Sequence, residues 1–190
     1  MSTPNELEQV HIVAYGLSEI VDNTIHLLQG ILAMGEKYPT RVRSNAKNDW
    51  YSLAYSALLK NLVLEVASLL DHAKYRNESN CNFKELKCVL ESCDEAKQKY
   101  QAVIAEIDEL VAKYDSMLPD ALRNKVIAHK DLEKLFSLEE YNVNLIEISR
   151  FLVEGHKIVS DVMEQTVGVP LPFPDYDAIK HNYEESFTLP

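Results

Sequence analysis

The feature that most constrains the fold is a long stretch without a helix breaker. No proline or glycine occurs between Pro39 and Pro119. The tight turns of a β-sandwich need these residues repeatedly, because they supply the backbone angles of a turn. The 190 residues are 46% hydrophobic, and a domain of this size removes about 70% of its extended surface from water. The sequence therefore predicts an all-α protein with a core of its own.

Apolar residues recur at spacings of three and four, the period of an amphipathic α-helix. The pattern covers four long segments, approximately 3–35, 49–70, 94–116 and 137–167. Shorter helices are expected near Phe83 and after Pro119. Residue pairs typical of a capping box open three of these helices; they are Thr3/Glu6, Asn82/Glu85 and Ser137/Glu140. Together these patterns predict an up-and-down four-helix bundle with short additional helices.

The C-terminal end differs in composition from the rest of the chain. Four of the seven prolines and four aromatic residues fall in its last residues, VPLPFPDYDAIKHNYEESFTLP. Such a segment cannot form one helix. We therefore expect a helical domain over 1–167 and an extended, Pro/aromatic-rich C-terminal tail over 168–190.

Several features predict a cytoplasmic protein that neither crosses nor binds a membrane. The N-terminal residues MSTPNELEQV lack the pattern of a signal peptide. No uninterrupted run approaches the roughly 20 apolar residues of a membrane span. The three cysteines, Cys81, Cys88 and Cys93, form no C-x-x-C pair, which favours a reducing compartment over a disulfide framework.

The charge is unevenly distributed. The net charge of −11 argues against a protein that coats nucleic acid by bulk electrostatics. Residues 37–60, however, carry five bases against one acid, whereas residues 1–36 carry five acids and no base. Because arginine can grip phosphate in a bidentate way, four basic residues are candidate RNA contacts: Lys37, Arg41, Arg43 and Lys47. The alternative is an ordinary solvated loop.

Patterns for metal and cofactor chemistry are weak in this sequence. Glu8 and His11 form one Glu-x-x-His unit, but di-iron bundles use that unit in pairs. The sequence contains no H-E-x-x-H, no G-x-x-x-x-G-K and no G-x-S-x-G. We therefore expect neither a metal nor a cofactor.

One polar cluster has the residue types that phosphodiester chemistry needs. The segment LRNKVIAHKD, residues 122–131, places His129 six positions after Arg123. Histidine titrates near neutral pH, which suits proton transfer. The same spacing recurs between Arg150 and His156, so the spacing alone is not specific. The alternative is that 122–131 is an amphipathic segment with a solvated charged side.

The wider context of the first pattern resembles the abortive-infection branch of the HEPN superfamily. The resemblance rests on R-N-K-x-x-A-H-x-D at 123–131, on LDHAK at 70–74 with its preceding leucine, and on NFKEL at 82–86. It covers roughly residues 10–165. It implies a helical bundle that dimerises and, in active members, a metal-independent endoribonuclease that leaves a 2′,3′-cyclic phosphate.

The resemblance also suggests residue roles. His129 would take the proton of the 2′-hydroxyl, and Arg123 would stabilise charge on the phosphorane oxygens. Asn124 would orient the phosphate or the histidine, and Asp131 would support them. His156 is expected to be structural, so His156→Ala should leave cleavage unchanged.

The helical spacing of the pair favours a site shared by two chains. Six positions of a regular helix amount to about 600°, which leaves a net rotation of about 240° between Arg123 and His129 with a rise of roughly 9 Å. Motifs that meet across a two-fold axis could supply both groups to one cleft. The sequence thus predicts a homodimeric ribonuclease acting in phage defence or as the toxin of a toxin–antitoxin pair, with an antitoxin protein as a further partner. The alternatives are a non-catalytic HEPN-like module that binds RNA or a protein, and a small-ligand helical bundle.

Overall fold

The structure is a computed structural model, and it describes residues 6–39, 50–71, 74–75, 78–92, 94–118, 143–172 and 174–175. Helices account for almost all of these residues, so the predicted all-α fold is confirmed. The described elements are α1 (Glu6–Lys37), α3 (Trp50–Leu70), β1 (Lys74–Tyr75), β2 (Glu78–Ser79), α4 (Phe83–Leu90), α5 (Asp94–Lys99), α6 (Gln101–Tyr114) and α9 (Leu145–Val167). β1 and β2 form a two-stranded antiparallel pair that pairs Lys74 with Ser79.

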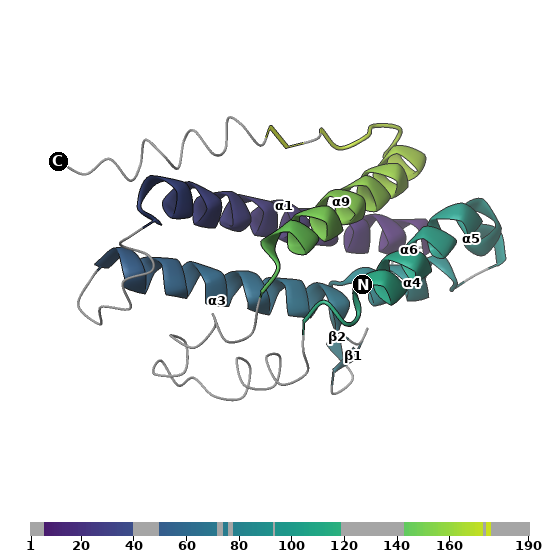
Figure 1. Ribbon diagram of the computed structural model, residues 1–190. Coiled ribbons are helices and arrows are strands. Elements are labelled where there is room, and N and C mark those ends of the chain that lie inside the picture. The colour runs from purple at the N-terminus through teal and green to yellow at the C-terminus, as the bar shows by residue number, and fades with distance from the viewer. Residues whose placement is uncertain are drawn as a thin grey trace.

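Helix α1 is the central element (Figure 1). It packs against α9, α3 and α4, while α6 packs against α9 and α4. Its core side is a stripe at helical spacing, buried almost completely: Val10, Ala14, Leu17, Val21, Ile25, Leu28 and Ile31. The apolar period of the sequence is therefore the period of the buried face. The up-and-down order of four long helices stays a prediction.

The Asn82 half of the expected capping pair is present at the start of α4. The side-chain oxygen of Asn82 accepts a hydrogen bond from the Glu85 N–H at 2.9 Å. The Asn82 amide also donates to the Asp71 carbonyl oxygen at 3.4 Å. This buried residue both starts α4 and ties it to the residue that follows α3.

Two expected helices differ in the structure. The segment expected at 94–116 is divided into α5 and α6 at Tyr100, whose backbone angles of −103° and 18° leave the helical region. The Tyr100 ring is fully buried and its hydroxyl lies 3.0 Å from the Thr166 hydroxyl of α9. This contact anchors the break against α9.

The last helix begins later than the sequence pattern indicates. The Ser137/Glu140 pair lies outside the described residues, but Val143 and Asn144 are not helical. The Asn144 side chain accepts hydrogen bonds from the N–H groups of Ile146 and Glu147, so Asn144 is the N-cap of α9. A continuous helix from Ser137 was therefore wrong, because an asparagine cap satisfies the backbone donors at this point.

The end of α9 and the beginning of the tail are fixed by local hydrogen bonds. Gly168 has a left-handed φ of 78° and its N–H donates to the Glu164 carbonyl oxygen. The Leu171 N–H then donates to the Ser160 hydroxyl at 3.0 Å. The first residues after α9 therefore turn back along that helix, while 176–190 lie outside the described residues.

Helix α3 is long and apolar enough to cross a membrane, which by itself is weak evidence because core helices pass the same test. Its packing explains only part of the composition, because 33% of the apolar window is buried. Leu62, Val63, Val66 and Leu69 are fully buried in the core, and α3 packs along α1 and against α4.

Gly155 of α9 leaves room for the ring of Phe83, the first residue of α4. A β carbon on Gly155 would stand 2.6 Å from the Cζ atom of Phe83. Phe83 is fully buried, and its ring lies edge-on to Phe151 with 5.8 Å between centroids. The ring can move aside only by disturbing the core.

We expect Gly155→Val to lower the free energy of unfolding by about 3 kcal/mol, because overpacking a filled core costs about 1–3 kcal/mol or more. The unfolding midpoint measured by circular dichroism should fall by roughly 6–12 °C. Gly35→Ala is the control, since its β carbon would stand an ordinary 3.9 Å from the Tyr55 ring. That change should be neutral or stabilising by up to about 1 kcal/mol. A midpoint for Gly155→Val at or above that of the wild type would contradict the close-packing argument.

Candidate functional site

Most residues predicted for the site lie outside the described part of the chain. Residues 119–142 contain Arg123, Asn124, His129 and Asp131, and residues 40–49 contain Arg41, Arg43 and Lys47. Lys37 is described, and it is the exposed last residue of α1. Its Nζ atom lies 6.0 Å from the centroid of the Tyr38 ring.

The described residues on both sides of 119–142 are held by the contact between α6 and α9. Leu118 is buried in the core, and the Met117 N–H donates to the Tyr114 carbonyl oxygen. The Tyr114 hydroxyl donates to Glu154 of α9 at 2.9 Å, and its ring lies 5.4 Å from that of Phe151. The segment 119–142, which contains the candidate motif, therefore continues at both ends into one packed pair of helices, α6 and α9.

The second Arg–His pair, Arg150 and His156, is separated by burial. Arg150 is exposed on α9, whereas His156 is only 1% exposed. The Nδ1 atom of His156 lies 3.2 Å from Oδ1 of Asp22 on α1. His156 thus holds α9 against α1, and its ring is closed to an RNA phosphodiester. Burial, which spacing does not report, makes the 150/156 pair a poor candidate.

The structural role of His156 changes its value as a control. Removing a buried imidazole leaves a cavity and deprives Asp22 of its partner, and both effects destabilise a fold. His156→Ala is therefore expected to lower stability even if the chemistry is unaffected. His26 lies exposed on α1 and is the better histidine control.

A cleft between α6 and α9 has both acidic and basic walls and a volume of about 230 Å³. Lys113 pairs with Glu154 at 2.6 Å, and Lys157 pairs with Glu106 and Asp161 at 3.1 and 3.0 Å. These hydrogen-bonded carboxylates raise the pKa of both lysines. Because both ammonium groups already have carboxylate partners, the cleft is a poor phosphate site.

Cys81 does not have the environment of a nucleophile. Cys81 and Cys88 are free thiols, and Cys81 Sγ lies 3.6 Å from the Val13 carbonyl oxygen. Burial first, and then the nearby Glu85 carboxylate, raise the pKa of the Cys81 thiol. A reactive cysteine needs the opposite shift. Among the described residues, no group of three or more His, Cys, Asp or Glu side chains could hold a metal ion.

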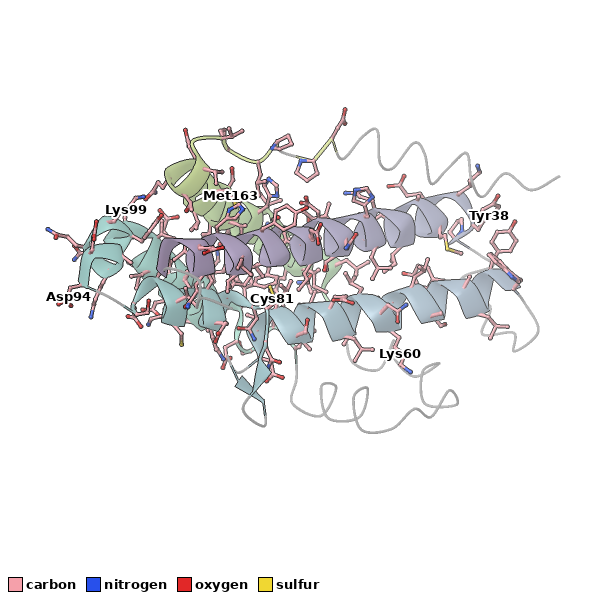
Figure 2. All side chains as sticks on the ribbon, turned by 180° about the vertical axis from the view of Figure 1, so that it is seen from behind. Tyr38, Lys60, Cys81, Asp94, Lys99 and Met163 are labelled. Atoms are coloured by element: carbon pink, nitrogen blue, oxygen red, sulfur yellow. The ribbon has the colours of Figure 1, made fainter. Side chains whose placement is uncertain are left out.

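Aromatic side chains that the sequence reasoning missed lie beside Lys37. Tyr38 follows α1, while Trp50 and Tyr51 begin α3, and the Tyr38 and Tyr51 ring centroids are 4.4 Å apart. Figure 2 shows Tyr38 where α1 ends and α3 begins, at the opposite end of the molecule from Asp94 and Lys99. The sequence does contain one indication of this site, because Tyr38 and the Trp50–Tyr51 pair lie on either side of the basic segment 40–49.

The comparison with protein families agrees with the helical fold and with the HEPN resemblance. The HEPN-type family model described as AbiU2 matches residues 6–186, almost the whole chain. The chain therefore belongs to the AbiU2 family of HEPN-type abortive-infection proteins. The searches of curated proteins and of solved structures found no match.

Proposed function

We propose that this protein is a metal-independent endoribonuclease of the HEPN type. The observation that carries the proposal is R-N-K-x-x-A-H-x-D at 123–131 in a chain that belongs to the AbiU2 family. The burial of His156 supports the choice, because it removes the competing pair at 150 and 156 from consideration. Arg123 and His129 are then the candidate catalytic pair.

The chemistry follows from the two side chains and from RNA itself. Every RNA phosphodiester has a neighbouring 2′-hydroxyl. Neutral His129 takes the proton of that hydroxyl, and the 2′ oxygen forms a bond to phosphorus. The bond from phosphorus to the 5′ oxygen breaks, and this oxygen leaves as a hydroxyl after taking a proton. The products are a 2′,3′-cyclic phosphate and a free 5′-hydroxyl.

The other residues of the motif assist this reaction. The Arg123 guanidinium stabilises the negative charge that grows on the non-bridging phosphorane oxygens. Asn124 orients the phosphate or the imidazole, and Asp131 supports that arrangement. The basic residues Lys37, Arg41, Arg43 and Lys47 would bind the RNA backbone, which would make affinity depend on salt.

In this proposal the protein acts in the cytoplasm as a homodimer, in phage defence or as the toxin of a toxin–antitoxin pair. The outer side of α1 supports a basic antitoxin as a partner. Glu8, Glu19 and Glu36 are exposed along this helix. Such an acidic surface complements a basic protein and disfavours sequence-independent coating of RNA.

The decisive experiment is cleavage of a defined single-stranded RNA by the purified wild-type protein in excess EDTA. We expect cleavage to persist, because no step uses a metal ion. By mass spectrometry the 5′ fragment should end in a 2′,3′-cyclic phosphate, and the 3′ fragment should begin with a 5′-hydroxyl. Cleavage that EDTA abolishes, or a 5′ fragment that ends in a 3′-hydroxyl, would refute the mechanism. RNA binding without any cleavage would instead favour the non-catalytic module.

A further inference from the structure

The end of the molecule where α1 meets α3 has an unusual surface. Trp50 is the single tryptophan of the chain, and it is 58% exposed in the first turn of α3. Its ring stands edge-on to Tyr51 with 5.6 Å between centroids. Tyr51 in turn contacts Tyr38 at 4.4 Å. Three aromatic rings therefore form one connected cluster, which we call the aromatic cluster (Tyr38, Trp50 and Tyr51).

Fold stability explains only part of the aromatic cluster. The contact between Tyr38 and Tyr51 fastens the end of α1 to the beginning of α3. Trp50 adds little to that contact, since more than half of its surface remains in water. Leu53, one turn further along α3, is also 42% exposed. Contiguous exposed apolar groups of this kind mark binding surfaces.

The charge around the aromatic cluster indicates which kind of ligand it fits. Lys37 Nζ lies over the Tyr38 ring, and the sequence from 37 to 49, which joins the end of α1 to the beginning of α3, carries four basic residues against one acid. The neighbouring segment 1–36 carries only acids among its charged residues. A polyanion would therefore be attracted to this end of the molecule and repelled along α1. Aromatic rings beside positive charge are the two components of a single-stranded nucleic-acid site.

We propose that Tyr38, Trp50 and Tyr51 form a stacking platform for unpaired bases of RNA. This inference rests on the proposed function, and it specifies the substrate class as single-stranded RNA. The faces of bases in a duplex are covered by their neighbours, so an aromatic ring can stack only on bases that are unpaired. Lys37 pairs with the phosphate backbone beside the stacked bases.

The single tryptophan provides a direct measurement, because all tryptophan emission comes from the platform itself. The experiment uses full-length His129→Ala, which binds RNA without cleaving it. We expect a 10-nucleotide single-stranded RNA to quench Trp50 emission in a saturable way. A blunt duplex of the same sequence should quench it far less.

Variants separate stacking from general attraction to RNA. In fluorescence anisotropy with a labelled single strand, Trp50→Ala should weaken binding roughly 5- to 150-fold, the loss typical of one base–aromatic stack. Trp50→Phe should restore most of the affinity. Tyr15→Ala is the matched control, since Tyr15 is 51% exposed on the same helix as Lys37, about 35 Å from Tyr38 along the axis. It should leave affinity unchanged.

Four other outcomes would overturn the platform, and a fifth would overturn the ribonuclease instead. If anisotropy detects RNA binding but Trp50 emission is not quenched, the bases bind elsewhere. If the duplex quenches Trp50 as much as the single strand does, the RNA backbone contacts the cluster without stacking of bases. Trp50 emission that changes with protein concentration alone, and not with RNA, would make a second copy of the chain the occupant. If the Trp50→Ala protein cleaves RNA as fast as the wild type, the platform is refuted while the proposed function stands. Saturable quenching without wild-type cleavage would refute the ribonuclease and leave the platform.

Discussion

Replacing His129 with alanine is expected to slow RNA cleavage roughly 100- to 10,000-fold, the contribution that a positioned general base or acid makes. The loss should appear in the rate of the chemical step measured in single turnover. Binding of single-stranded RNA should change little, because a neutral imidazole adds no charge to the backbone contacts. A folded His129→Ala protein that cleaves at the wild-type rate would refute the assignment.

Arg123→Ala is expected to lower the same rate roughly 100- to 1,000-fold, comparable to removing one donor that stabilises an oxyanion. Arg123→Lys should recover only part of it, because an ammonium group cannot form the two parallel hydrogen bonds of a guanidinium. In the wild type, the cleavage rate plotted against pH should have a limb that depends on the histidine. This limb should be absent in His129→Ala and present in Arg123→Ala.

The described helices provide matched controls for both substitutions. His26 and Arg150 are exposed on α1 and α9, so their replacement by alanine removes the same side-chain types without opening the core. Both variants should cleave RNA at the wild-type rate. A large loss in either would mean that the assay reports general surface charge or folding and not the motif.

The sequence was sufficient for the fold class because the fold follows from local signals repeated many times. The buried stripe of α1 has the spacing of three and four that the sequence shows. The cap at Asn82 forms the hydrogen bond that its spacing from Glu85 predicts. These elements depend on residues within a few positions of one another, which is the range that pattern reasoning covers.

Tertiary contacts caused the differences. The break at Tyr100 depends on a hydroxyl contact to Thr166, which lies 66 positions away. The burial of His156 depends on Asp22, which lies 134 positions away. No local pattern reports such partners, so spacing could not rank the two Arg–His pairs. The aromatic cluster was missed for the same reason, since Tyr38 and Tyr51 meet only once α1 and α3 are packed.

A mixture of two inactive variants tests how the motif forms a site. If Arg123 of one chain acts with His129 of the other, homodimers of Arg123→Ala and of His129→Ala each lack a complete pair. After co-expression in equal amounts, about half of the dimers are mixed, and each mixed dimer regains one Arg–His combination across the two-fold axis. We expect cleavage to return to about a quarter of the wild-type rate if the dimer has two separate sites, and to about half if both motifs share one cleft.

The opposite arrangement predicts a different result. If each chain supplied its own Arg123 and His129, every chain in the mixture would lack one of them, and cleavage would stay at the level of the single variants. The helical spacing argues against that arrangement, since a net rotation of about 240° makes the two side chains of a regular helix point about 120° apart. Sedimentation of the wild type at micromolar concentration is the necessary companion measurement, and we expect a dimer. A monomer that cleaves RNA, or a mixed dimer that does not, would refute the composite site while leaving the chemistry assigned to His129 intact.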